Sequence, residues 1–308
     1  MCAKISLLRQ NTLLAIVSLC FPLAATASDD SLAKYAAPYL LRGVGARPVA
    51  MGNAYIAESN DTQALYYNPA GLAFLKYTGI GSMISPQSQD QHLWSLEVSQ
   101  PLGAYGGLGA GVIMNQIGDI EGRADEFSAP TNINSREGAF LLAYGYSPAP
   151  EWSVGVTAKY LFHRFDGLSD HGRGQAFDLG GKWVPQQVKD LVLAAVAQNI
   201  GGSFHWSTGR QDPVLFVFKL GASYRPTPWL LTVLDIDFRG DKAVRAHAGL
   251  EATHSLFAFR VGANHDRPTF GFGITSPKAR LRLRFDYAFE FDPHGLEDVN
   301  RFSFSVRF

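Results

Sequence analysis

The sequence predicts an all-β protein, an antiparallel transmembrane β-barrel of about 14 strands with a small N-terminal plug in its lumen. Three observations favour this fold. Apolar and polar residues alternate through almost every segment after residue 78, as they do in strands with one apolar face. The connections between these segments alternate between short and long ones. The chain ends on an aromatic residue, which closes one more alternating segment.

The first 27 residues have the parts of a cleavable secretory signal peptide. Lys4 and Arg9 precede an apolar run over residues 13–23, and a small-residue cleavage pattern follows at residues 25–27. A protein with this signal is exported across the inner membrane. Together with the barrel pattern, it predicts a location in the cell outer membrane of a Gram-negative bacterium.

Cysteine content and charge argue against several classes of protein. Both cysteines, Cys2 and Cys20, lie in the predicted signal peptide, so the mature protein has no disulfide and no thiol chemistry. Lipid attachment at Cys20 would require a small residue before it, and Leu19 is large. Without the signal peptide, 25 basic residues (27 minus 2) stand against 27 acidic ones, a net charge of −2. This balance does not favour nucleic acid as a partner.

Residues 28–77 precede the strands, and we expect them to form a plug, or hatch, inside the barrel, with the barrel itself over residues 78–308. A lumen of about 14 strands is too wide for wall side chains alone to fill and narrower than that of an open porin. Asn60 or Asp61 is the expected cap of a short helix over residues 62–67.

Asn68, Pro69, Ala70 and Gly71 form the motif on which the plug prediction rests. The proline disfavours a helical conformation at Asn68, so the short helix should end there. Asparagine first, proline second and glycine fourth are the residue types of a type I turn. The sequence therefore predicts a compact, capped unit immediately before the first strand.

The residues after the plug alternate with strongly apolar faces, most completely over residues 280–291. No later run approaches the roughly 20 apolar residues of a membrane helix, so a membrane protein of this sequence must be a closed barrel. Periodicity alone also fits a soluble sandwich, in which apolar faces pack together. Aromatic residues near strand ends favour the barrel, because membrane interfaces carry aromatic girdles; these residues are Trp94, Trp152, Trp183, Trp229, Tyr144, Tyr146 and Tyr224.

The predicted strands cover residues 78–86, 91–100, 105–116, 136–147, 151–165, 173–184, 189–200, 214–225, 228–239, 242–253, 256–265, 268–275, 279–291 and 299–308. Connections after even-numbered strands are short and rich in proline. Connections after odd-numbered strands include all the long ones, at residues 117–135, 166–172, 201–213 and 292–298. Outer-membrane barrels combine short periplasmic turns with longer outside loops, which agrees with both termini lying in the periplasm.

The last strand presents Phe302, Phe304, Val306 and Phe308 on one face. It resembles the terminal strand that the bacterial barrel-assembly machinery recognises, so we expect these residues to be the assembly signal. An ordinary edge strand is the alternative. An apolar edge left open would be an aggregation hazard, and closure into a barrel removes it.

Charged residues on the polar faces should line the lumen. Candidate lumen-lining residues are Lys159, Arg225, Asp235, Asp237, Arg245, Arg260, Arg282, Arg284, Asp286 and Glu290. One interpretation is structural, with opposite charges pairing and holding the plug. The other is that they line a solute path or a binding pocket. The sequence does not identify which of them would do so.

Several fragments together resemble a known family. The stretch over residues 43–73, GVGARPVAMGNAYIAESNDTQALYYNPAGLA, resembles the N-terminal signature of the PorV/PorQ family of bacterial outer-membrane proteins. That family is similar to the fatty-acid transporter FadL, which has a related Asn-Pro-Ala element. Later fragments agree in order and spacing: FDLGGKW at residues 177–183, AVAQNIGG at 195–202, KLGASYR at 219–225, HAGLE at 247–251 and FDYAFEF at 285–291.

The resemblance implies two functions of different classes, and a purely structural membrane protein remains a third. A FadL-like protein would pass hydrophobic or amphipathic small molecules through a plugged lumen. A PorV-like protein would belong to a type IX-like secretion system and hand over exported proteins. Closer residue matches favour the second, and the modest outside loops favour the first. We expect the transport function, with the secretion function as the alternative. Expected partners are outer-membrane lipid, the barrel-assembly machinery, and either a hydrophobic ligand or secretion components.

No enzymatic site is expected. The eight histidines are scattered without a motif, so no catalytic set with a serine and an acid can be assigned. No ligand cluster has the spacing of a metal site, and we expect no cofactor. The glycine-rich stretch over residues 106–111 superficially resembles a nucleotide-binding loop, but no helix follows it. Glycines in a crowded barrel strand explain it better.

Overall fold

A computed structural model describes residues 29–308, except 89, 124–126, 128, 168–169, 278–280 and 296–297. The predicted signal peptide lies outside these residues. In the described part, fourteen strands form a closed antiparallel barrel, and one short strand pairs beside it. No helix in this part is long and apolar enough to cross a membrane.

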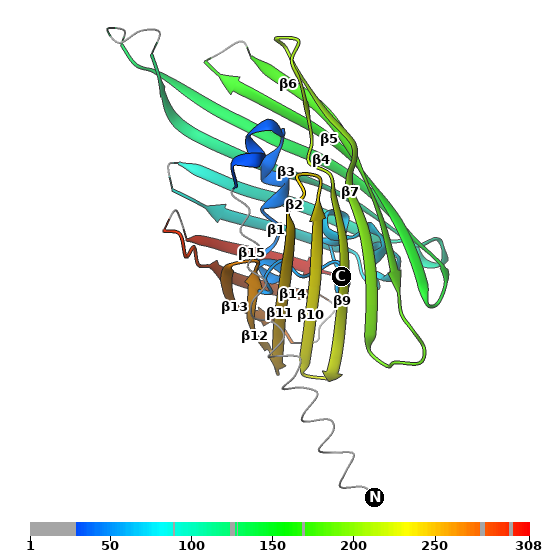
Figure 1. Cartoon of the computed structure of the whole chain (residues 1–308). Coiled ribbons are helices and arrows are strands. Elements are labelled where there is room, and N and C mark those ends of the chain that lie inside the picture. The colour runs from blue at the N-terminus through cyan, green and yellow to red at the C-terminus, as the bar shows by residue number, and fades with distance from the viewer. Residues whose placement is uncertain are drawn as a thin grey trace, which may run out of the picture.

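The barrel strands follow the chain in order around the ring (Figure 1). They are β1 (Gly79–Pro86), β2 (Gln91–Pro101), β3 (Gly107–Gly122), β4 (Thr131–Ala149), β5 (Trp152–Asp166), β6 (His171–Trp183), β7 (Leu191–Trp206), β9 (Val217–Thr227), β10 (Leu230–Arg239), β11 (Val244–His254), β12 (Phe257–Asn264), β13 (Arg267–Thr275), β14 (Arg282–Glu290) and β15 (Val299–Arg307). The short β8 (Gln211–Pro213) pairs only with β7.

The first and last strands close the ring. β1 pairs with β15 over six residues, from Gly79 opposite Arg307 to Ile84 opposite Phe302. At their other edges, β1 pairs with β2 and β15 pairs with β14. The terminal strand therefore has no free edge, which removes the aggregation hazard of an apolar edge.

All fourteen predicted strands are confirmed, and the main difference is their length. Residues 117–122 and 131–135, predicted as loop, extend β3 and β4, and β7 continues to Trp206. β8 was not predicted at all. Polar residues and glycines together make up most of these extensions, and the alternation that identifies the other strands is weak there.

The extended strands make one side of the barrel taller than the other (Figure 1). β3 to β7 have 13 to 19 residues, whereas β9 to β15 have 8 to 11. A membrane needs only about 9–11 residues per tilted strand. The extra residues all lie at the end of the barrel opposite the C-terminus. We call this the loop end, and the end with the C-terminus the turn end.

The outward face of the barrel is apolar, as predicted. Leu142 and Phe259 are each 62% exposed, although both are large and apolar. At the turn end, the rings of Trp152 and Trp183 stack with their centroids 5.5 Å apart. Exposed apolar side chains in the middle and exposed aromatic rings near one end match the lipid-facing belt and girdle of outer-membrane barrels.

The N-terminal residues form short helical elements inside the ring. They are η1 (Asp29–Lys34), η2 (Pro38–Leu41), α2 (Ala46–Ala50), α3 (Ala64–Tyr67) and η3 (Pro69–Phe74). A further short helix, η4 (Gly103–Tyr105), lies in the turn between β2 and β3. α3 begins two residues later than predicted. The predicted cap at Asn60 or Asp61 is therefore wrong, because Gln63 is the N-cap residue and no side chain caps the helix. Oδ1 of Asp61 instead accepts a hydrogen bond from the backbone nitrogen of Gln63 at 3.1 Å.

Candidate functional site

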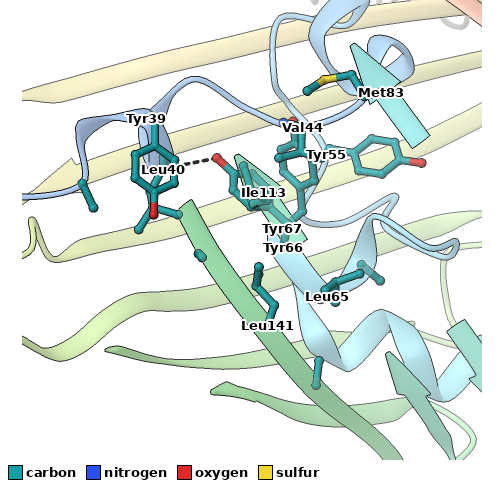
Figure 2. Close-up of a cluster of buried hydrophobic side chains, with 14 of the residues drawn as sticks. Tyr39, Leu40, Val44, Tyr55, Leu65, Tyr66, Tyr67, Met83, Ile113 and Leu141 are labelled. Atoms are coloured by element: carbon teal, nitrogen blue, oxygen red, sulfur yellow. Dashed lines mark hydrogen bonds between the residues drawn. The ribbon is translucent and has the colours of Figure 1, made fainter. Parts of the chain in front are cut away.

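The luminal segment, residues 43–74, fills the middle of the barrel. η3 lies against β3 to β6, and α2 lies against β12 to β15 on the other side. Between residues 43 and 72 all residues are buried except Asn60, which is exposed, and Asp61 and Gln63, which are half-buried. Figure 2 shows tyrosines of this segment among apolar side chains of the barrel wall, with the Tyr66 hydroxyl donating to the carbonyl of Leu40 at 2.5 Å.

Glycines of four neighbouring strands provide a flat surface for the motif Asn68–Gly71. A Cβ atom on Gly155 would lie 2.5 Å from the backbone nitrogen of Ala70, and one on Gly180 would lie 3.1 Å from Cδ of Pro69. Only glycine allows two backbones to approach this closely. We call this row the glycine seat. Its members are directly paired in the sheet: Gly107 of β3, Gly145 of β4, Gly155 of β5 and Gly180 of β6.

The Asn68 side chain joins the two turns of the luminal segment to the wall. Its Oδ1 accepts a hydrogen bond from the nitrogen of Ala70 at 3.1 Å. Its Nδ2 donates to the carbonyls of Ile56 at 3.0 Å and Gly181 at 3.2 Å. Gly71 donates from its backbone to the carbonyl of Asn68 at 2.9 Å, so the predicted turn is present and continues as η3.

Replacing Asn68 by alanine should destabilise the protein by about 1–3 kcal/mol, because the buried backbone nitrogen of Ala70 would lose its acceptor. The measurement is denaturant unfolding in detergent, followed by tryptophan fluorescence. Asn132→Ala is the matched control, since Asn132 is exposed near the loop end and should unfold with the unsubstituted protein. Identical midpoints for both variants would show that Asn68 does not hold the segment.

A second close approach holds the opposite side of the luminal segment. Met51 and Gly52 lie against Gly249 and Gly262, which are paired in β11 and β12. A Cβ atom on either wall glycine would lie within 2.7 Å of a Met51 atom. The Gly52 nitrogen donates to Oγ1 of Thr269 at 3.1 Å. The segment is thus fixed by backbone contacts on two walls.

Polar side chains of the wall satisfy the irregular backbone of the luminal segment. Oδ2 of Asp235 accepts from the nitrogens of Tyr55 at 2.7 Å and Ile56 at 3.1 Å. Oγ1 of Thr157 donates to the carbonyl of Leu65 at 2.9 Å. Buried backbone groups outside regular structure need such partners. The other wall side chains that bond this backbone are Gln198, Lys182, His247, Thr269, Ser303 and Arg301.

Arg47 of α2 is the centre of a buried charge network. Its guanidinium contacts both carboxylate oxygens of Glu251 in β11, at 2.8 and 2.9 Å. It also lies 3.0 Å from Oε1 of Glu58 and donates to the Tyr55 hydroxyl at 2.7 Å. Two hydrogen bonds to one carboxylate give this pair strength and a fixed geometry. The network links the luminal segment to the wall electrostatically.

The structure places the ten candidate lumen-lining residues on the inward faces of their strands. Arg260, Arg284 and Asp286 join the Arg47 network, with Nε of Arg260 2.6 Å from Oε2 of Glu251. Arg225 joins the same network through Glu58. Three others have separate partners: Lys159 with Asp178, Asp237 with Lys219 and Glu290 with Arg267. Asp235 accepts hydrogen bonds from the backbone nitrogens of Tyr55 and Ile56, as described above. Arg245 and Arg282 are half-buried.

An aromatic cluster at the loop end was not predicted. The His163 ring centroid lies 4.4 Å from that of Phe165 and 5.3 Å from that of Trp206. All three side chains are half-buried, and Trp206 packs against the buried core that includes Tyr39 and Leu40. We call His163, Phe165 and Trp206 the mouth cluster. The alternation of side chains in a strand could have indicated part of this cluster, because Phe165 shares the inward face of β5 with Lys159 and His163.

Arg47 and Glu58 were also missed as members of the site. Single charges among small residues carry no periodic signal, and their partners are distant in sequence. The terminal-strand residues lie outside the lumen. Phe302, Phe304 and Phe308 are between 37% and 53% exposed on the apolar outer face. Among the described residues, no group of three or more His, Cys, Asp or Glu is placed to hold a metal ion.

Comparison with known proteins finds similarity in structure alone. No family model matches the chain, and no curated protein matches it. The monoaromatic hydrocarbon channel CymD and the P. putida toluene transporter TodX each match with a TM-score of 0.57 at 14% identity, over 87% of this chain and 97% of theirs. A FadL homologue of Pseudomonas aeruginosa matches with a TM-score of 0.53 at 9% identity, over 83% of this chain and 95% of its own.

Two of these structures are described as a channel and a transporter, and the third as a FadL homologue. At such identities the similarity concerns the fold. The PorV/PorQ resemblance stays a prediction, because no comparison shows that family. The chain therefore shares the fold of FadL-type barrels, with its N-terminal residues inside the lumen.

Proposed function

We propose that this protein is an outer-membrane channel that passes hydrophobic or amphipathic small molecules, with the luminal segment acting as its plug. The mouth cluster carries the proposal. It presents half-buried rings on the inner face of the wall that the long strands β3 to β7 form, which we call the tall wall. Trp206 of this cluster packs against the core that includes Tyr39 and Leu40. Rings on this face do not meet lipid, so they offer an apolar surface to a molecule that enters the barrel.

The shape of the barrel supports entry of the molecule at the loop end. The tall wall extends beyond the belt at the loop end, which faces the outside when the short turns and the C-terminus face the periplasm. Aromatic rings bind apolar molecules by area and by stacking. The similar structures include a toluene transporter and a monoaromatic hydrocarbon channel, which fits this chemistry.

The test is uptake of radiolabelled toluene, and separately of oleate, by Gram-negative cells that carry no other barrel of this type. The unsubstituted protein should raise uptake of at least one probe. Trp206→Ala combined with Phe165→Ala should lower that uptake about tenfold, because lost ring contacts of this kind are worth about 1–1.5 kcal/mol.

Trp183→Ala is the matched control, since Trp183 is exposed on the outer face at the turn end. It should leave uptake unchanged. Equal losses in both variants would point to a general defect of the barrel. No uptake of either probe, with exported proteins recovered in stoichiometric amount in a pull-down from gently solubilised outer membranes, would favour the secretion-type function and reject the channel.

A further inference from the structure

The luminal segment is held by close backbone contacts on two walls, whereas its residues 61–63 are held more loosely on a third. At the glycine seat and at Met51–Gly52, a single added Cβ atom would collide with backbone. Between these contacts, residues 60–63 face β14, β15 and β1 across a polar cavity of about 20 Å³. That volume holds about one water molecule. We call this space the crevice.

Most of the residues around the crevice are polar, with Phe304 and Val306 as the apolar ones. Thr62 and Gln63 of the luminal segment face Gly81 of β1 and Ser303 and Ser305 of β15. No large apolar side chain of the luminal segment enters it, in contrast to the leucines and tyrosines that pack against β2 to β5. One water molecule can therefore fit at this boundary of the segment, whereas the boundaries at the glycine seat and at Met51–Gly52 are closed by backbone.

Asp61 is paired loosely with the arginines at the crevice, whereas Arg284 and Asp286, which also line it, are paired at 2.8 Å. Oδ2 of Asp61 lies 3.6 Å from Nη2 of Arg307 and 3.9 Å from Nη1 of Arg47, beyond the distance of a good hydrogen bond. Its firm contact is internal to the segment, with the Tyr55 hydroxyl donating at 2.7 Å. Oε1 of Gln63 is buried with no hydrogen-bond partner among the described residues. The wall thus holds residues 60–63 weakly.

Exposure of the segment is confined to the same place. Between residues 43 and 72, only Asn60, Asp61 and Gln63 are not fully buried. They lie at the turn end, because Asp61 contacts Arg307, the last residue of β15. The loosest boundary of the luminal segment therefore opens toward the side that faces the periplasm in the proposed orientation.

We infer that the crevice is the release site of the channel. This inference rests on the proposed function. Residues 60–63 move away from β15 and β1, while the glycine seat and the Met51–Gly52 contact stay closed. A passing molecule leaves between Thr62 and Gly81 toward the periplasm. The polar lining favours amphipathic molecules, whose polar groups can replace the crevice water as they pass.

Two engineered disulfides test the inference. A Cβ atom on Gly81 would lie 3.4 Å from Cβ of Thr62, and one on Gly109 would lie 3.2 Å from Cβ of Leu65, both close to the spacing of about 3.5–4.5 Å in disulfides. Thr62→Cys with Gly81→Cys closes the crevice. Leu65→Cys with Gly109→Cys ties the same segment to β3, away from it. The chain has no cysteine after residue 20, so no other thiol competes.

Uptake of toluene and oleate is measured in the oxidised and the reduced state of each pair. We expect oxidation to abolish uptake through the Thr62–Gly81 pair, reduction to restore it, and the Leu65–Gly109 pair to conduct in both states. Uptake blocked by the Leu65–Gly109 disulfide, or unaffected by the Thr62–Gly81 disulfide, would overturn the release site and leave the channel function standing. No uptake by the unsubstituted barrel would overturn the proposed function, and the inference with it.

A second measurement applies if the Thr62–Gly81 variant does not fold. Gln63→Cys places one thiol in the crevice, and Gln187→Cys places one on the exposed turn after β6. A charged thiol reagent that reaches the periplasm should stop uptake through the Gln63→Cys barrel and leave the Gln187→Cys barrel active. Full uptake after complete modification of Gln63→Cys would contradict release through the crevice.

Discussion

Gly155→Ala should displace the luminal segment from the wall. The new Cβ atom would lie 2.5 Å from the backbone nitrogen of Ala70, and neither the strand nor the motif can yield as a flexible side chain could. Overpacking of this kind costs about 3 kcal/mol. We expect a lower unfolding midpoint in denaturant together with a rise in ion conductance in planar bilayers, because a barrel of this width conducts when its lumen is emptied.

Gly181→Ala is the matched control for this prediction. Gly181 follows Gly180 of the seat in the same strand, but the atom nearest to an added Cβ would be the carbonyl oxygen of Ser153, 3.8 Å away. That is an ordinary contact. The control should unfold and conduct as the unsubstituted protein does. A Gly155→Ala barrel with unchanged stability and conductance would show that the motif is not seated as described.

Arg47→Met should be the most destabilising exchange of a charged residue. It leaves Glu58 and Glu251 buried without the guanidinium that they share, and removing one partner of a buried pair typically costs about 3–5 kcal/mol. Unfolding in denaturant measures the loss. The same variant should conduct more, because α2 would lose its link to β11.

Arg136→Met provides the comparison, since its ion pair with Asp166 is exposed at the loop end, with 54% of the Arg136 side chain accessible. Exposed pairs contribute about 0–1 kcal/mol. A double-mutant cycle over Arg47 and Glu251 then isolates their coupling. Equal small effects at Arg47 and Arg136 would contradict the role of the buried network in holding the segment.

The strands could be predicted because their signal is local. Side chains in a strand alternate between two faces with a period of two, so the segment over residues 280–291 showed its charged and apolar faces directly. The same reasoning failed at residues 117–122 and 131–135. Beyond the membrane belt, neither face must be apolar, and the alternation fades although the backbone pairing between β3 and β4 continues.

The site could be predicted only in part. The inward faces of the strands followed from parity, and the Asn68–Gly71 motif from its residue types. The ion-pair partners of these residues could not be predicted from the sequence. Arg47 and Glu251 are 204 residues apart, and no pattern near Arg47 indicates a charge network. Lys159 was expected to face inward, yet its pairing with Asp178 at 2.8 Å depends on how β5 and β6 align.

The sequence by itself determined the barrel, its lipid-facing residues and the presence of a segment unlike the strands, because these depend on residue types and on their spacing along the chain. Only the tertiary structure decided where that segment sits. Register aligns Gly107, Gly145, Gly155 and Gly180 into one seat, and closure of β1 on β15 creates the crevice beside Thr62. Both arise from contacts between residues far apart in sequence, which hydrogen bonding across the whole ring brings together.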